Sequence, residues 1–141
     1  MSGEADLRVL LASMQPRLDT AVYVWASVDS ASVANEVVAA AVVTVREDEG
    51  LTLVLESSIA EAYGLKCEYP SARITLEVHS ALEAVGLTAA FAAALGDVGI
   101  SANVVAGYHH DHIFVPCERA DDAMMALRQL SAASALRARN P

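Results

Sequence analysis

The stretch from Ile74 to Pro116 constrains the fold most, because its hydrophobic pattern changes from strand spacing to helix spacing and back. Gly99 ends the helical part, since the apolar stripe stops there and glycine tolerates the backbone conformation that closes a helix. In order, the stretch predicts a strand at 73–78, a polar loop at 79–80, a helix to 99, a strand at 100–108, a turn at 109–111 and a strand at 112–115. It therefore predicts a β-α-β-β unit.

The rest of the chain predicts further short elements before and after this unit. Residues 37–46, VVAAAVVTVR, form a nearly continuous apolar run, which is typical of a strand covered on both faces. Glu47 to Gly50 has the composition of a hairpin turn. Residues 66–71 contain Pro70 and predict a boundary between two modules. The other expected elements are a helix at 6–13, strands at 19–27 and 51–55, a helix from Ser57 or Ser58 to Ala62, and a last helix at 117–136.

The order of these elements indicates the fold class. Helices on one face of a mostly antiparallel sheet form an α+β sandwich of ferredoxin-like type. At 141 residues the chain is one domain, or two small modules that share a core. No strand is expected after the last helix, so we expect a strand to be shared between the two halves or between subunits.

The charge balance excludes several kinds of partner. The formal net charge of −9 argues against nucleic acid and against acidic membrane surfaces, because both need clustered Lys and Arg. No apolar run approaches the roughly 20 residues that span a bilayer, and the start MSGEAD does not resemble a signal peptide. A cytoplasmic protein is expected. Cys67 and Cys117 form no CxxC pair, so they predict semi-buried free thiols, and no cofactor is expected.

Several pieces of the sequence carry a family resemblance. Residues 85–101 are similar to the ACT signature, in which a Gly opens a helix that ends in Gly-Ile before the second strand. Val85 stands where that signature often has Pro. More specifically, the chain resembles a family of small bacterial proteins built from two tandem ACT-like modules, and the second module is similar to those of cytosolic amino-acid sensors. The pieces that carry this resemblance are REDEGLTLVL (46–55), LEVHSALEAVGLTAA (76–90) and HDHIFVP (110–116).

The resemblance implies a fold and a general task. It implies two tandem modules of βαββαβ type, an N-terminal ACT-like module at 1–67 and a C-terminal ACT domain at 68–141. It also implies a regulatory protein that binds an amino acid or another small carboxylate metabolite. ACT modules commonly bind their ligand in the loop between the first strand and the first helix, at an interface between modules, so a homodimer is expected.

The loop from His79 to Gly86 is the candidate ligand site. Gly86 lets the backbone approach a ligand closely, and the amides that open the next helix point towards it. A ligand carboxylate would sit there, with Ser80 able to donate a hydrogen bond. The candidate ligand-binding residues are His79, Ser80, Leu82, Val85, Gly86, Leu87, Thr88, His110 and His112.

The start of the following helix has two interpretations. Ser80 and Glu83 have capping-box spacing, so the helix could begin at Ala81 and contain Gly86. A glycine inside a helix costs about 1 kcal/mol, which favours a start after Gly86. In the first interpretation Ser80 would be a helix cap.

The four histidines suggest a second class of function. His110 and His112 alternate to one face of a strand with Asp111 opposite, so two imidazoles could reach one metal ion or one ligand. Whether His79 meets them stays open. Three hypotheses follow: a non-catalytic amino-acid-binding regulator, which we favour; a metal-dependent or hydrolytic enzyme using these histidines, the hydrolytic version with Ser80; and a structural interaction module without a ligand.

Overall fold

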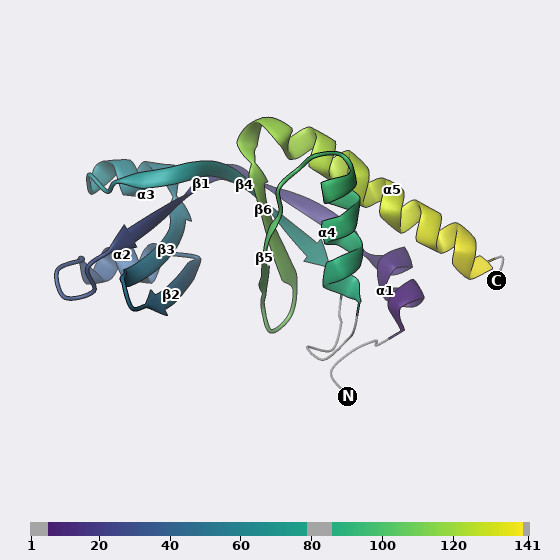
Figure 1. Ribbon diagram of the computed structural model, residues 1–141, viewed down its shortest axis with the longest axis horizontal. Helices are drawn as coiled ribbons and strands as arrows, with labels where there is room; N and C mark the ends of the chain where they lie inside the picture. The colour runs from purple at the N-terminus through teal and green to yellow at the C-terminus, as the bar shows by residue number, and fades with distance from the viewer. Residues whose placement is uncertain (1–5, 79–85, 140–141) are drawn as a thin grey trace. The chain divides into compact units, whose positions relative to one another are not determined.

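The computed structural model describes residues 6–78 and 86–139, which form two compact units (Figure 1). The inserted unit is Thr20–Ala72, and the split unit combines Met1–Asp19 with Arg73–Pro141. Two strands, β1 and β4, contribute residues to both units. The elements are α1 (Leu7–Ser13), β1 (Gln15–Val28), α2 (Asn35–Ala40), β2 (Val43–Glu47), β3 (Gly50–Glu56), α3 (Ser57–Ala62), β4 (Cys67–Glu77), α4 (Leu87–Asp97), β5 (Asn103–Ala106), β6 (Asp111–Pro116), a 3-10 turn (Cys117–Arg119) and α5 (Ala120–Arg139).

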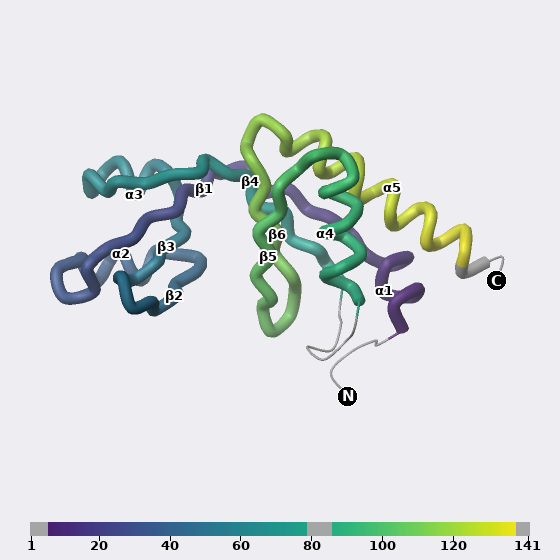
Figure 2. The backbone as a smooth tube through the Cα atoms, viewed as in Figure 1, coloured from purple at the N-terminus to yellow at the C-terminus, as the bar shows by residue number. Residues whose placement is uncertain are grey.

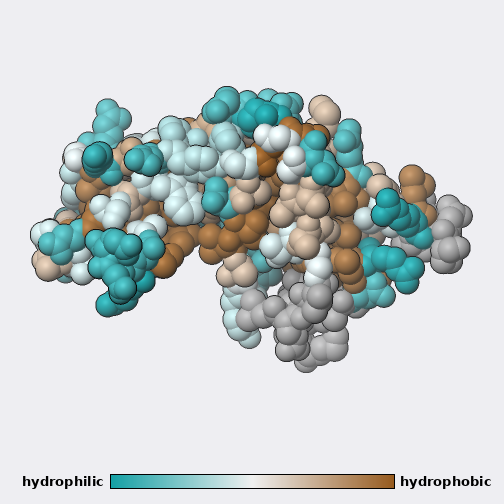
Figure 3. All heavy atoms as spheres, viewed as in Figure 1, coloured by the Kyte–Doolittle hydropathy of each residue, from teal (hydrophilic) through white to brown (hydrophobic). Residues whose placement is uncertain are grey.

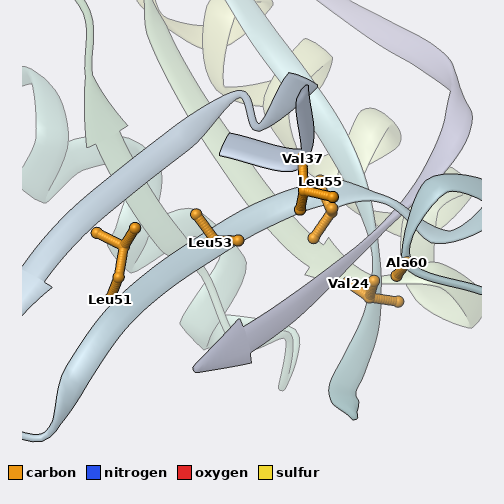
Figure 4. Close-up of a cluster of buried hydrophobic side chains, with 6 residues drawn as sticks. All are labelled: Val24, Val37, Leu51, Leu53, Leu55 and Ala60. Atoms are coloured by element: carbon orange, nitrogen blue, oxygen red, sulfur yellow. The ribbon is translucent and has the colours of Figure 1, made fainter. Parts of the chain in front are cut away.

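The inserted unit has the order β-α-β-β-α-β along the chain, and its strands lie in the order β2-β3-β1-β4. The strand β3 pairs antiparallel with both β2 and β1. Alternate residues of β3 point to one face, and there they meet side chains from β1, α2 and α3 (Figure 4). Both helices therefore cover the same face of the sheet. The buried cluster consists of Val24, Val37, Leu51, Leu53, Leu55 and Ala60.

The split unit contains the β-α-β-β pattern that was expected from the sequence, and Figure 2 follows it from β4 through α4 to the β5–β6 hairpin. Its strands lie in the order β1-β4-β6-β5. The first residues of β1 thus supply the fourth strand of this unit. Arg17 Nε and Glu77 Oε1, on β1 and β4, are 2.6 Å apart. The strand sharing that we expected occurs within one chain, because each long strand serves both units.

The helix α1 belongs to the same unit and packs on α5. Asp6 caps it, since its Oδ1 accepts from the amide of Arg8 at 3.0 Å. The hydroxyl of Ser131, on α5, donates to the backbone oxygens of Ala12 and Met14 at 3.3 and 3.2 Å. These bonds satisfy carbonyl groups at the end of α1 that have no partner inside the helix. The N-terminal segment is therefore an integral part of the split unit.

Several expected elements are confirmed. Gly50 pairs with Glu47 across the β2–β3 hairpin, and a Cβ at Gly50 would lie 2.9 Å from the backbone oxygen of Val28. The helix α4 starts after Gly86, as favoured above, and buries Leu87, Phe91 and Leu95. The ferredoxin-like α+β class is confirmed as well. The sequence boundary between residues 67 and 68 stays a prediction.

Other expectations are wrong. Residues 37–40 belong to the helix α2, and only residues 43–46 of the apolar run lie in β2, which pairs with β3. The run is also not covered on both faces, since Val42 and Val45 are 37% and 47% exposed. Alanine and valine occur in either state, so the periodicity of this run does not distinguish helix from strand. Residues 67–71, where the boundary between modules was expected, are the first part of β4.

Candidate functional site

The structure places only part of the predicted ligand site. Of the nine candidate residues, five are described: three at the start of α4 and two at the β5–β6 hairpin. The other four, His79, Ser80, Leu82 and Val85, lie outside the described residues. Whether His79 meets the hairpin histidines therefore stays a prediction.

Gly86 has the backbone conformation that a loop–helix junction needs. Its φ is 94°, in the left-handed region that favours glycine, and it precedes α4 without a side-chain cap. Leu7 fills the space beside it, since a Cβ at Gly86 would lie 3.0 Å from the nearer Leu7 methyl carbon. Leu87 is only 3% exposed and belongs to the core, whereas Thr88 is exposed. Among these three residues, Gly86 and Thr88 are accessible enough to contact a ligand.

His112 lies on β6 with its imidazole against β4. Its Nδ1 is 3.0 Å from the hydroxyl of Thr75 and 3.4 Å from an Nη of Arg73. A guanidinium has no acceptor atom, so Nδ1 accepts the bond from Arg73, and the neutral ring carries its proton on Nε2. Burial lowers the pKa of His112, and the positive charges of Arg73 and His110 lower it further. His112 is thus a neutral hydrogen-bond donor at physiological pH.

His110 has a different environment, because it lies in the turn before β6. Its backbone oxygen accepts from the amide of Gly107 at 2.9 Å, and its buried Nδ1 has no hydrogen-bond partner among the described residues. Beside it, burial raises the pKa of Asp111, and the positive charge of His110 partly offsets that effect. The hairpin therefore carries two imidazoles and a carboxyl that are each partly desolvated.

The geometry of His112 disfavours metal binding at this hairpin. A metal ion on Nε2 would require the proton to move to Nδ1, where it would face the Arg73 guanidinium. Within residues 6–78 and 86–139, no three His, Cys, Asp or Glu side chains are grouped closely enough to hold a metal ion. Ser80, the nucleophile of the hydrolase hypothesis, is not described.

The inserted unit has a hollow that the sequence analysis did not identify. It has a volume of about 820 Å³ and lies between the loop that follows β1 and the β2–β3 hairpin. On the face shown in Figure 3, hydrophilic residues gather over this end of the unit. Its polar lining includes Asp29, Ser30, Asn35, Arg46, Asp48 and Glu49, and apolar residues such as Val33 and Val38 complete it. The polar residues that line it are visible in the sequence, but Glu47 to Gly50 was interpreted only as a hairpin turn.

Local hydrogen bonds shape this hollow. The carboxylate of Asp29 accepts from the amide of Ala31 at 3.0 Å, and its backbone oxygen accepts from the amide of Val33 at 3.0 Å. These bonds close a turn after β1. The hydroxyl of Thr52 donates to Glu47, which holds that carboxylate on the hairpin. Arg46 is exposed and makes no ion pair with any residue that the structure describes.

Comparison with protein-family models identifies both halves of the chain. A model described as an ACT domain matches residues 2–72, and a second ACT domain model matches residues 68–129. The chain belongs to the ACT domain family. It contains two tandem ACT domains, as the sequence resemblance predicted. ACT domains are typically regulatory ligand-binding modules.

Solved structures support the same assignment. A Vibrio cholerae protein of unknown function, described as a possible transport protein, has a TM-score of 0.78 and 48% identity, over 89% of this ACT chain and 95% of that one. An Agrobacterium tumefaciens protein has a TM-score of 0.71 and 15% identity, over 84% and 89% of the two chains. The ligand-free regulatory subunit of Thermus thermophilus aspartate kinase has a TM-score of 0.62 and 13% identity, over 82% and 95%. The last two show the fold alone. No curated protein matches the sequence significantly.

The ACT topology relates the hollow to the predicted site. In the inserted unit, the loop after the first strand and the hairpin between the second and third strands line one hollow. The equivalent parts of the split unit are the segment between β4 and α4 and the β5–β6 hairpin, which carries His110. By element order, each ACT unit thus has the same two connections. No helix of the described chain is long and apolar enough to cross a membrane.

Proposed function

We propose that this ACT protein is a non-catalytic regulator that binds an amino acid or another small carboxylate metabolite. The hollow of the inserted unit carries this proposal. Its volume of about 820 Å³ falls within the usual range of small-molecule sites, and its lining combines polar groups with an apolar wall. It also lies at the loop between the first strand and the first helix, where ACT modules commonly bind ligands.

The lining of the hollow carries both signs of charge, with the Arg46 guanidinium among the carboxylates of Asp29, Glu47, Asp48 and Glu49. The guanidinium of Arg46 can bind a carboxylate through two parallel hydrogen bonds. Asp48 and Glu49, on the adjacent turn, can accept hydrogen bonds from an ammonium group. Ser30 and Asn35 add neutral polar groups on the other side. A small amino acid carries one charge of each sign.

We propose a second ligand site of the same kind in the split unit. Gly86 and the amides that open α4 would approach the ligand carboxylate, and the hairpin would contact the rest of the ligand. The Nε2 proton of His112 supports this proposal, because it gives the hairpin a hydrogen-bond donor. The proposed contacts are His79, Ser80, Leu82, Val85, Gly86, Leu87 (through its amide), Thr88, His110 and His112.

Thermal unfolding with each of the twenty amino acids tests the proposal. A ligand at 100 times its Kd stabilises the folded state by about 2.7 kcal/mol, so at least one amino acid at millimolar concentration is expected to raise the Tm. The substitution Arg46→Ala is expected to weaken binding in the inserted unit about 10- to 100-fold, because a charged hydrogen bond contributes about 1.5–3 kcal/mol.

The matched control is Lys66→Ala, which removes an exposed cation of the same unit outside the hollow. Titration calorimetry on the three proteins then separates a site effect from a general loss of positive charge. A Tm that no amino acid raises would refute the amino-acid proposal. Equal affinity of the wild type and Arg46→Ala would show that Arg46 does not bind the ligand.

We further propose that the two modules divide near residues 67 and 68, that the protein acts in the cytoplasm, and that it forms a homodimer. Cys67 and Cys117 are both free thiols, and Cys67 is exposed, which suits a reducing compartment. Cys67 differs here from the semi-buried thiol expected from the sequence. The homodimer is what the family resemblance implies, because ACT modules commonly bind their ligand at an interface between modules.

The alternative functions fit the structure less well. An enzyme centred on the histidines would need a metal or a nucleophile beside His112, and the Arg73 guanidinium opposes the metal version. An interaction module without a ligand is the second candidate, since one surface of α5 suits a protein contact. It predicts a stable dimer whose Tm does not respond to any amino acid.

A further inference from the structure

One face of α5 lines a hollow of the split unit and leaves it unfilled. The hollow has a volume of about 950 Å³, and Pro16, Arg17 and Leu18 of β1 form its other wall. The α5 residues that line it are Asp121, Met124, Met125, Arg128, Gln129 and Ala132. Their spacing of three and four residues makes them a single stripe along the helix, here called the α5 stripe.

The α5 stripe differs from the side of α5 that faces the core. Ala123, Ala126 and Leu127 are buried beneath the helix, and they account for its packing on the split unit. Met125 is 58% exposed in the middle of the stripe, and Ala132 near its end is small enough for close approach. Methionine is enriched at the centre of protein interfaces, where its flexible side chain adapts to a partner. Met124 is only 6% exposed and packs in the core, so Met125 is the large apolar side chain that the stripe offers to a partner, between Asp121 and Arg128.

The charges of this surface point to a second copy of the same chain. Arg17, Glu77, Asp121 and Arg128 sum to zero, whereas the whole chain carries −9. Two acidic chains repel each other least where their surfaces are neutral. Asp121 and Arg128 make no ion pair with another residue in the described part of the chain, although Arg17 and Glu77 bind each other.

The edge of β1 beside the stripe is unsuited to strand addition. Pro16 has no amide proton, and proline on an edge strand interrupts the ladder that an added strand needs. A helix can dock on this surface without using the backbone of β1. The stripe is therefore suited to helix–helix contact.

We propose that the α5 stripe is the homodimer interface, with the α5 helices of two copies antiparallel about a two-fold axis between Met124 and Met125. Asp121 lies three residues before Met124, and Arg128 lies three residues after Met125. An antiparallel pair centred there places Asp121 of each copy opposite Arg128 of the other. Such an interface is self-complementary, as a two-fold contact must be. The two Met125 side chains lie next to the axis, one on each side of it.

This inference rests on the proposed homodimer and names its surface. Sedimentation equilibrium of the full chain should show a dimer for the wild type. The substitution Met125→Glu should raise the dimer dissociation constant at least about 10-fold, because it places a charge where the apolar Met125 side chain lies. The control is Val45→Glu, which changes a residue 47% exposed on β2 of the inserted unit, and it should leave the constant unchanged.

Charge reversal gives a second test that does not depend on Met125. Asp121→Arg and Arg128→Asp should each weaken the dimer, and the two together should restore it, since the pairs re-form with opposite signs. Circular dichroism checks that each variant is folded. A monomeric wild type would overturn both the homodimer and this interface, whereas a dimer insensitive to Met125→Glu and to both single reversals would overturn the interface alone. Neither result affects ligand binding, which the thermal shift measures separately.

Discussion

At the scale of single residues, His112 shows how a neighbour decides the chemistry of a side chain. The sequence predicted His110 and His112 on one face of a strand, where they could bind a metal ion. The structure brings Arg73 to Nδ1, which assigns the proton to Nε2 and favours a hydrogen-bond donor over a metal ligand. Arg73 lies 39 positions away in the sequence, so no local pattern could indicate this contact.

His112 should make stability depend on pH. Its pKa is lowered in the folded state from an ordinary value of 6.5, so the unfolded chain binds the proton first as pH falls. The stabilising effect is complete above pH 6.5 and is lost as pH falls from there towards the folded pKa. Urea unfolding between pH 5 and pH 8 should show this slope for the wild type and a flatter profile for His112→Gln.

The matched control for this measurement is His109→Gln, because His109 is exposed at the same hairpin. That variant should keep the slope of the wild type. An identical pH profile for His112→Gln and the wild type would show that the histidine does not titrate differently on folding.

At the scale of elements, the β5–β6 hairpin depends on close backbone contact at its turn. The amide of Gly107 donates to the backbone oxygen of His110, and a Cβ at Gly107 would lie 2.7 Å from that same oxygen. The imidazole of His112 would be 3.3 Å from the added carbon. Both the turn and the orientation of His112 therefore need a residue without a side chain at this position.

The substitution Gly107→Ala should consequently destabilise the protein by about 1–3 kcal/mol, the usual cost of local strain and overpacking. Gly96→Ala is the matched comparison, since it lies within α4 with nothing within 4 Å of the added Cβ. It should stabilise the protein by up to about 1 kcal/mol, because alanine is the better helix former. Chemical denaturation measures both changes. Equal effects of the two substitutions would contradict the argument.

At the scale of the whole molecule, the ACT units are interleaved along the chain. The split unit includes α1 and the first residues of β1, which come from the N-terminal segment. In the sequence, the inserted unit lies between this segment and the remainder of the split unit. The family models match two consecutive stretches, 2–72 and 68–129. The compact units have other bounds, because residues 1–19 pack with residues 73–141. A strand from the start of the chain completes the unit formed by its end.

Excision of residues 20–72 tests this arrangement. A chain of residues 1–19 joined through a short Gly-rich turn to residues 73–141 should fold cooperatively, because β1 and β4 are neighbours in the split unit. Residues 68–141 alone lack the β1 strand and α1, and they should not. Urea unfolding followed by circular dichroism distinguishes the two. A cooperative transition of residues 68–141, as stable as that of the excised chain, would show that the N-terminal segment is dispensable.

The sequence alone determined the features that depend on neighbours a few residues apart. The β-α-β-β order after β4, the hairpin at Gly50 and the start of α4 after Gly86 follow from local periodicity and from glycine, and all three are confirmed. Only the tertiary structure decided which strand completes each unit, where the hollow of the inserted unit lies, and that residues 37–40 are helical. These features depend on contacts between distant segments, and a short run of alanine and valine does not by itself distinguish a helix from a strand.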